Sequence, residues 1–260
     1  MRLHATSELI FEVSTPVPLI LMLRPRSGHG QWVTQELYEL EPGIPVVEYT
    51  DGYGNLCQRL VAPVGQFRVR TGAVVHTADS IDVQPGAPFT PVQDLPAEVL
   101  PFLLPSRYCE SDRLGTMATE IITDASPGYD QVAAICRWIH DNLTYQYGTS
   151  DASTSAIQTS QQRQGVCRDF AHLGIALCRS LSIPARMVVG YLHRLEPMDL
   201  HAWLEAFVAG RWYTFDPTQS VPRGGRIAIA YGRDAADVAL ATRFGPAELT
   251  SLAVEVKEAP

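Results

Sequence analysis

Residues 164–191 read QGVCRDFAHLGIALCRSLSIPARMVVGY, and the interpretation of the whole chain starts from this stretch. After Cys167 the apolar residues fall on several sides of a helix, so the segment from Val166 to about Leu181 is predicted to be a buried helix. Pro184 ends that helix, and the β-branched segment ARMVVGYLH after it predicts a strand. The sequence thus predicts a thiol in the first turn of a buried helix that leads into a strand.

Cys167 is the candidate nucleophile because of this position. The free N–H groups at a helix N-terminus favour the thiolate form of a cysteine, and the thiolate is the reactive form. Cys178 lies deep in the same predicted helix and is expected to be a packing residue. The chain has five widely spaced cysteines and no CxxC pair. A disulfide framework or a zinc ribbon is therefore not expected.

A reactive cysteine needs a base, and the base needs a group that orients it. The segments HAWLEAFV and RWYTFDPT flank Ala209-Gly210, which predicts a β-hairpin. With Trp203 opposite Asp216, the carboxylate becomes a diagonal neighbour of His201, within reach of a hydrogen bond. A slip of one residue would turn Asp216 to the other face. The spacing thus permits a His201–Asp216 pair without requiring it.

The chain is predicted to be an α+β protein. Residues 1–83 contain short alternating segments, with Gly and Pro between them, at roughly ten-residue spacing, and an antiparallel β-sandwich or small barrel is expected there. Residues 84–106 contain six prolines and are predicted to be a linker or crossover. Residues 107–260 contain the predicted helices and the hairpin, and form the predicted catalytic domain.

Composition excludes several classes of function. The chain has 260 residues, is 46% hydrophobic and carries a formal net charge of −8, which is typical of a soluble globular protein. It has no basic stripe for nucleic acid. The first residues show no signal peptide, and no apolar run approaches the roughly 18 residues needed to cross a bilayer. We therefore expect a cytoplasmic protein without a nucleic-acid or membrane partner.

The motifs GVCRDFAHL, IPARMVVGY, HAWLEAF and WYTFDPT, in this order, resemble the transglutaminase-like superfamily of papain-type thiol enzymes. The resemblance is strongest to the bacterial branch described as transglutaminase-like cysteine proteases with a β-rich N-terminal domain. The segments DGYGNLCQRL, LLPSRYC and YGRDAADV are also similar to that branch. The resemblance therefore extends over nearly the whole chain.

This resemblance implies a papain-like core, in which a central helix packs on an antiparallel sheet. It implies a triad of Cys167 as nucleophile, His201 as general base and then acid, and Asp216 as the group that orients the imidazole. The implied reaction is acyl transfer at amide bonds of a protein or peptide through a thioester, with no cofactor and no metal. Hydrolysis is the favoured outcome, and transfer to an amine uses the same residues. The Cys167 N–H is an expected oxyanion donor, with Tyr145 or Gln162 as candidates for the second.

Other interpretations stay open at this point. Asp199 or Asp169 are alternative partners for the base. Cys167, His172, His201 and Asp216 are also a possible zinc set, although no HExxH motif or close cysteine pair accompanies them. A third possibility is a module that binds peptides without cleaving them. The oligomeric state and the identity of the substrate do not follow from the sequence.

Overall fold

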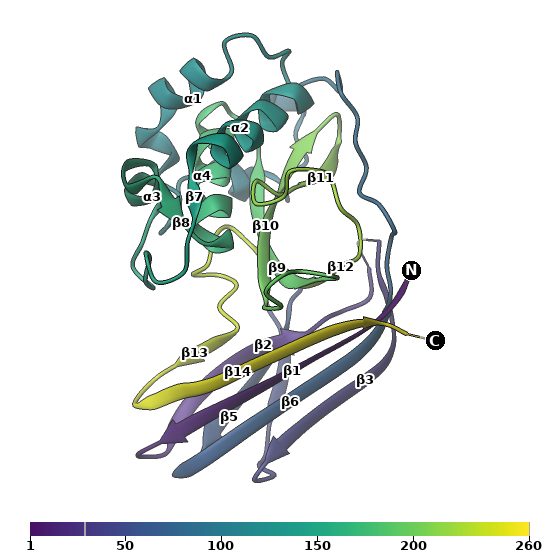
Figure 1. Cartoon of the computed structure of the whole chain (residues 1–260), viewed down its shortest axis with the longest axis vertical. Helices are drawn as coiled ribbons and strands as arrows, with labels where there is room; N and C mark the ends of the chain where they lie inside the picture. Colours follow the sequence, from purple (N-terminus) through teal and green to yellow (C-terminus); the bar gives the residue numbers. More distant parts are fainter. Residues whose placement is uncertain (29, 260) are drawn as a thin grey trace.

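The structure is a computed structural model that describes residues 1–28 and 30–259. Two parts lie one above the other in Figure 1, a lower layer of β-strands and an upper part that combines helices with a second set of strands. This arrangement confirms the predicted α+β class, with an antiparallel β domain and a helix-on-sheet core. The two termini lie side by side at one edge of the β layer.

The β layer consists of two four-stranded antiparallel sheets. One has the order β14-β1-β6-β3, with β1 (Arg2–Val13), β3 (Trp32–Glu41), β6 (Gly65–His76) and β14 (Ala247–Glu258). The other has the order β13-β2-β5-β4, with β2 (Val17–Arg24), β4 (Val47–Thr50), β5 (Leu56–Ala62) and β13 (Ala241–Arg243). Buried and less buried residues alternate along β1 and β2, as expected when one face of each sheet covers a shared core.

The C-terminal strands differ from the expected division of the chain. Strand β14 pairs with β1 along nearly its whole length, from Leu3 opposite Glu258 to Val13 opposite Ala247. Strand β13 pairs with β2 in the second sheet. The end of the predicted catalytic domain, 107–260, therefore belongs structurally to the β layer. Pairing between the two ends of a chain leaves no local signal in the sequence, so the hydrophobic pattern identified the strand but not its partner.

The upper part is built on a third antiparallel sheet, with the order β11-β10-β9-β12. Its strands are β9 (Ala185–Leu192), β10 (His201–Val208), β11 (Arg211–Phe215) and β12 (Arg226–Gly232). The helices are α1 (Gly115–Ile121), α2 (Tyr129–Asn142), α3 (Ala156–Gln162) and α4 (Cys167–Ser180). The short strands β7 (Thr144–Tyr145) and β8 (Gln164–Gly165) form a parallel pair just before α4.

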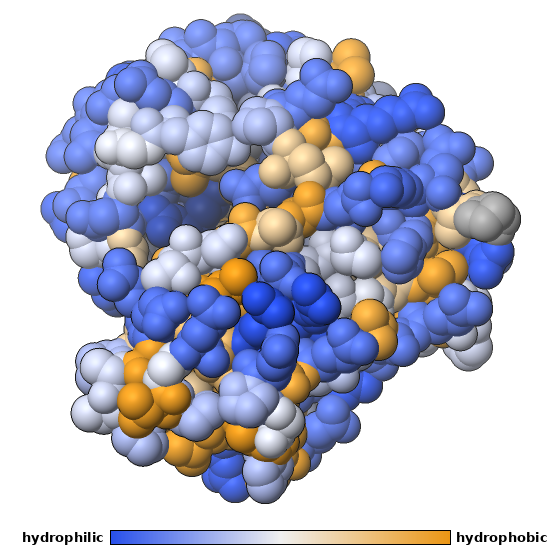
Figure 2. Space-filling view, turned by 60° about the horizontal axis from the view of Figure 1, so that its bottom comes forward, coloured by the Kyte–Doolittle hydropathy of each residue, from blue (hydrophilic) through white to orange (hydrophobic). Residues whose placement is uncertain are grey.

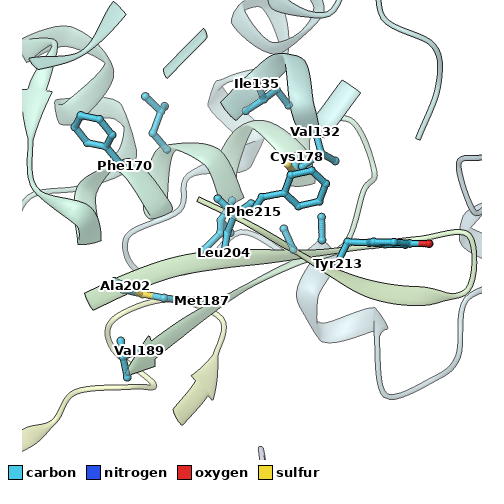
Figure 3. Close-up of a cluster of buried hydrophobic side chains, with 14 of the residues drawn as sticks. Val132, Ile135, Phe170, Cys178, Met187, Val189, Ala202, Leu204, Tyr213 and Phe215 are labelled. Carbon is cyan, nitrogen blue, oxygen red and sulfur yellow. The ribbon is translucent and has the colours of Figure 1, made fainter. Parts of the chain in front are cut away.

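Helix α4 is the buried helix predicted from the sequence, and its side chains form the main core together with the third sheet. Figure 3 shows Phe170 and Cys178 of α4 above Leu204 and Phe215 of the sheet. Leu204 and Cys178 are fully buried. A Cβ at Gly174 would lie 2.9 Å from Leu204 Cδ2, so the glycine allows the helix to approach the strand closely. This packing holds the start of α4 at a defined place relative to β10.

The proline-rich segment 84–106 is more than a connection. It forms two short 3₁₀ helices, η1 (Val92–Asp94) and η2 (Leu100–Leu103), and a third, η3 (Ser111–Arg113), follows. Its buried residues Leu95 and Val99 pack with Phe207 of β10. The segment therefore covers part of the sheet face opposite α4. The residues that pack here are apolar residues that stand between the prolines. Their spacing shows neither helical nor strand periodicity, so the packing could not be predicted from it.

The surface is mixed in character. Figure 2 shows hydrophobic side chains scattered among hydrophilic ones, with the larger orange areas toward the part of the molecule that holds the β layer. Exposed apolar residues there include Leu37, Val61 and Val64. Among the residues that the structure describes, none of the helices has the length and apolar character of a membrane span.

Candidate active site

Cys167 is the first residue of α4, as the sequence predicted. Asp169, two residues later, caps this helix because its Oδ2 accepts a hydrogen bond from the backbone N–H of Val166 at 2.9 Å. The same fully buried carboxylate also pairs with Arg168. A Cβ at Gly165 would lie 2.7 Å from the Asp169 Cβ, so this close approach needs the glycine. Asp169 thus fixes the start of α4 and does not serve as the partner of His201.

The hairpin that carries His201 has the predicted register. Its two-residue turn is Ala209-Gly210, with φ values of +50° and +78°, as in the turn type that matches the twist of a hairpin. Leu204 of β10 lies opposite Phe215 of β11. Continuing this register by one residue places Asp216, just after β11, on the same side of the hairpin as the imidazole of His201.

His201 and Asp216 form a buried pair. His201 Nε2 lies 2.7 Å from Asp216 Oδ2, and the two side chains are 1% and 3% exposed. The other carboxylate oxygen, Oδ1, accepts hydrogen bonds from the backbone N–H and the hydroxyl of Thr218, at 3.0 Å and 2.7 Å. Arg226 Nη2 donates to Oδ2 at 2.8 Å. Asp216 is therefore held on both oxygens, and its position determines the orientation of the imidazole.

The electrostatics of the pair favour the charged forms. Burial raises the pKa of the Asp216 carboxyl, but Arg226 and then His201 outweigh this effect and hold the pKa well below its usual value. Burial lowers the pKa of His201, whereas Asp216 and the neighbouring Cys167 raise it, to about 9. Around neutral pH the pair is therefore an imidazolium beside a carboxylate. This charge state suits a residue that must deliver a proton.

Cys167 interacts with the imidazole of His201. Interaction with the Cys167 side chain is among the causes that raise the pKa of His201. Because Nε2 is engaged by Asp216, Nδ1 is the ring nitrogen left for the sulfur. Nδ1 is buried and has no hydrogen-bond partner among the described residues. The three residues that the sequence singled out are thus brought together.

Tyr145, like His201, interacts with Cys167. Burial and then the adjacent Cys167 thiol raise the pKa of the Tyr145 hydroxyl, while a hydrogen bond with the backbone of Cys167 acts in the opposite direction. The other candidate from the sequence, Gln162, is an exposed residue at the end of α3. Of the two candidates for an oxyanion donor, only Tyr145 has an interaction with Cys167 among those described.

The alternative residues from the sequence occupy other places. His172 is fully buried, stacks on the Tyr108 ring at 5.1 Å, and accepts a hydrogen bond from the backbone N–H of Ala235. Burial lowers the pKa of His172 to about 4, so the imidazole is neutral at ordinary pH. Asp199 accepts from the backbone N–H of Leu200. No group of three or more His, Cys, Asp or Glu side chains within residues 1–28 and 30–259 is arranged to hold a metal ion.

Two residues that contact Asp216 were not predicted from the sequence. Thr218 follows in the DPT motif, and a threonine two residues after an aspartate is a common turn signal that would have identified it. Arg226 is ten residues away and begins another strand. An arginine at the start of an apolar strand gives no local indication of its partner.

The comparisons with known proteins identify the family of the chain. The family model of the transglutaminase-like superfamily matches residues 115–217, which include Cys167, His201 and Asp216. An uncharacterized protein of Mycobacterium leprae is 32% identical over 232 residues, which cover 84% of this chain and 82% of that protein. The chain belongs to the transglutaminase-like superfamily.

The similarity to one solved structure covers the whole chain. The chain is similar to a protein from Cytophaga hutchinsonii described as a "Putative Cysteine Protease", with 39% identity and a TM-score of 0.93. That match covers 100% of this chain and 91% of the other. The similarity to this structure therefore includes the β layer together with the helix-on-sheet core. Arg226 lies outside the residues that the family model matches.

Proposed function

We propose that the protein is a thiol enzyme that transfers the acyl group of an amide, with Cys167 as nucleophile, His201 as base and acid, and Asp216 as the orienting group. The buried His201–Asp216 contact of 2.7 Å, together with the interaction of Cys167 with the same imidazole, is the observation that carries this proposal. A protein or peptide is the proposed substrate. No cofactor is required by this chemistry.

In the proposed reaction the Cys167 thiolate attacks an amide carbonyl carbon and forms a C–S bond. The electron pair of the C=O bond moves to the oxygen, giving an oxyanion that needs hydrogen-bond donors. The backbone N–H of Cys167 and the hydroxyl of Tyr145 are the proposed donors, because Tyr145 lies against Cys167. The intermediate collapses, the C–N bond breaks, and His201 delivers its proton to the leaving nitrogen. A thioester remains on Cys167.

The second half of the reaction releases the acyl group. Water attacks the thioester carbonyl while His201 accepts one of its protons, and the C–S bond breaks to regenerate the thiolate. We favour this hydrolytic outcome. The alternative is attack by a primary amine, which would make the protein a transamidase with the same residues. The pair of His201 and Asp216 serves both outcomes equally, so it does not distinguish between them.

Offering a peptide mixture with and without a small primary amine distinguishes the outcomes, with intact mass as the readout. Peptide cleavage, deamidation of glutamine and incorporation of the amine give different masses. The Cys167→Ala variant is the control, because it retains the fold but lacks the sulfur. Product formation by the wild type alone supports the proposal. If the protein binds peptides equally well with or without the sulfur and converts none, it is a peptide-binding module.

A further inference from the structure

Arg226 contacts Asp216 directly and is linked to His201 through Trp203. Its Nη2 contacts Asp216 Oδ2 at 2.8 Å, the same oxygen that His201 Nε2 contacts. Its guanidinium lies over the ring of Trp203, 5.0 Å from the ring centroid, and Trp203 in turn stacks with His201. Its Nε donates to the carbonyl of Arg223 at 3.0 Å. The side chain is 7% exposed, so these contacts fix it within the interior.

A permanent cation at this place has two electrostatic effects. After the opposing effect of burial, its charge is the first of the causes that lower the pKa of Asp216, so it helps to keep the carboxylate charged. Because it shares Oδ2 with His201, its charge also disfavours the imidazolium and limits the rise in the His201 pKa. The titratable groups that interact with His201 are Cys167 from α4 and Asp216 after β11. The uncharged Trp203 stacks with it, and Gly190 lies opposite it on β9. Arg226 is the cation that contacts the Asp216 carboxylate in this group.

Strand β12, which begins with Arg226, is an edge strand of its sheet, and the β layer provides hydrogen bonds to its outer edge. The side-chain amide of Gln31 makes two hydrogen bonds of 2.8 Å to the backbone N–H and C=O of Ala228. The amide of Asn55 makes the same pair of 2.8 Å bonds to Tyr231. Both amides are buried, at 8% and 1% exposure. They pair with β12 as the backbone of a neighbouring strand would.

Two further hydrogen bonds hold the outer edge of β12 close to Arg226. The hydroxyl of Thr77 donates to the carbonyl of Arg226 at 2.7 Å. The carbonyl of Ala78 accepts from the backbone N–H of Gly225 at 2.9 Å. Thr77 and Ala78 directly follow β6 of the β layer. Hydrogen bonds from the N-terminal part of the chain therefore run along β12 from Gly225 to Tyr231.

We propose that Arg226 is a positioning residue for the His201–Asp216 pair, and that the β layer takes part in the site by holding strand β12 in place. This inference rests on the proposed thiol chemistry, but its central readout does not require turnover. It assigns a role to the N-terminal β domain and to the asparagine of the DGYGN segment.

Arg226→Met tests the charge, because methionine retains an unbranched apolar stem over Trp203. Arg226→Lys retains the charge and loses the fork of donors. Arg186→Met is the matched control. Arg186 is 9% exposed, pairs with Glu205 at 2.6 Å and lies over Trp212, but its described contacts do not include the triad. The readouts are the NMR titration of the His201 ring, kcat and KM against pH, and the melting temperature.

We expect Arg226→Met to raise the His201 pKa by about one pH unit. We expect kcat to fall by about tenfold or more with KM changed by less than about twofold. Arg226→Lys should restore the His201 pKa and part of kcat, and it remains informative if the methionine variant does not fold. Arg186→Met should lower the melting temperature without moving the His201 titration.

The inference is wrong if the His201 titration in Arg226→Met matches that of the wild type, or if Arg186→Met shifts it equally. The NMR titration also separates this inference from the proposed function. A shifted His201 pKa in a protein that converts no amide would refute the function alone. Full turnover with an unshifted pH profile in Arg226→Met would refute the role of Arg226 alone.

The contribution of the β layer has its own pair of variants. Gln31→Leu removes the buried amide that pairs with Ala228. Gln58→Leu removes another fully buried amide of the β layer, one whose side-chain atoms have no hydrogen-bond partner among the described residues. We expect only Gln31→Leu to lower kcat and broaden or shift the His201 signal, well below its melting temperature. Equal effects of the two variants would mean that the β layer contributes only to the stability of the fold and does not position the site.

Discussion

His201 Nε2 and Asp216 Oδ2 lie 2.7 Å apart although the residues are fifteen positions apart in the chain, because a two-residue turn folds their strands together. Asp216→Asn retains the shape of this contact and removes the negative charge. We expect the His201 pKa to fall from about 9 toward its ordinary value, since Asp216 is the main cause of its rise. We expect kcat to fall by about 100-fold or more. Steady-state kinetics and the NMR titration check both, and an unchanged His201 pKa would contradict the pairing.

Alkylation should distinguish Cys167 from the other cysteines. Burial raises the pKa of the thiols of Cys57, Cys109, Cys136 and Cys178, which slows their reaction with iodoacetamide. Cys167 is half-buried at a helix N-terminus beside an imidazolium. We expect it to be labelled first and alone at short times, as peptide mass spectrometry would show. Labelling of Cys136 or Cys57 at a similar rate would argue against a reactive Cys167.

The His201 pKa predicts how stability depends on pH. The folded value of about 9 lies above the unfolded value of 6.5, so protonated His201 stabilises the folded state. This contribution, on the order of 3 kcal/mol, is fully present below pH 6.5 and is lost as the pH rises through about 9. Urea unfolding of the wild type and of His201→Gln between pH 6 and pH 10 measures it. The difference between the two proteins should shrink toward alkaline pH.

Tyr145→Phe tests the proposed second oxyanion donor. The substitution removes only the hydroxyl, which interacts with the backbone of Cys167. We expect kcat to fall by about tenfold or more because the oxyanion loses a donor. The rate of Cys167 alkylation should change little, since alkylation forms no oxyanion. A parallel loss in both rates would instead mean that Tyr145 shapes the thiol's surroundings.

Gly190 is the residue opposite His201 on β9, and its lack of a side chain is required. A Cβ there would lie 2.0 Å from the carbonyl oxygen of Ile227 on β12. We expect Gly190→Ala to lower the free energy of unfolding by about 2 kcal/mol or more and to reduce turnover. Gly43→Ala is the control, because a Cβ at Gly43 meets no atom within 4 Å. Denaturant titration should leave that control close to the wild type.

The parts of the site set by local pattern could be predicted from the sequence. The position of Cys167 follows from the apolar run that forms α4. The register of the hairpin follows from Ala209-Gly210, because an even-length turn determines which residues share a face. That register permits Asp216 to lie beside His201, and the contacts with Thr218 and Arg226 hold it there. The family resemblance added the roles of these residues, and the comparisons support the family.

The parts of the site that depend on distant segments could not be predicted. Arg226 reaches Asp216 only because β12 pairs with β9, and its own neighbours in the sequence do not indicate this. Gln31 and Asn55 are amides in turn-rich stretches, where such residues usually serve local turns. Their partners lie 197 and 176 residues further along the chain. Contacts of this kind depend on how whole layers pack.

The pairing of β1 with β14 also constrains the order in which the protein assembles during synthesis. Strand β1 finds one of its two neighbours only after residues 247–258 have been translated. Until then, the backbone amides of β1 on that side must remain hydrated or shielded by a chaperone. Such a high contact order predicts slow, late completion of the β layer. The proposed thiol site would thus be complete only after residues 247–258 have been translated, if β12 depends on that layer as inferred.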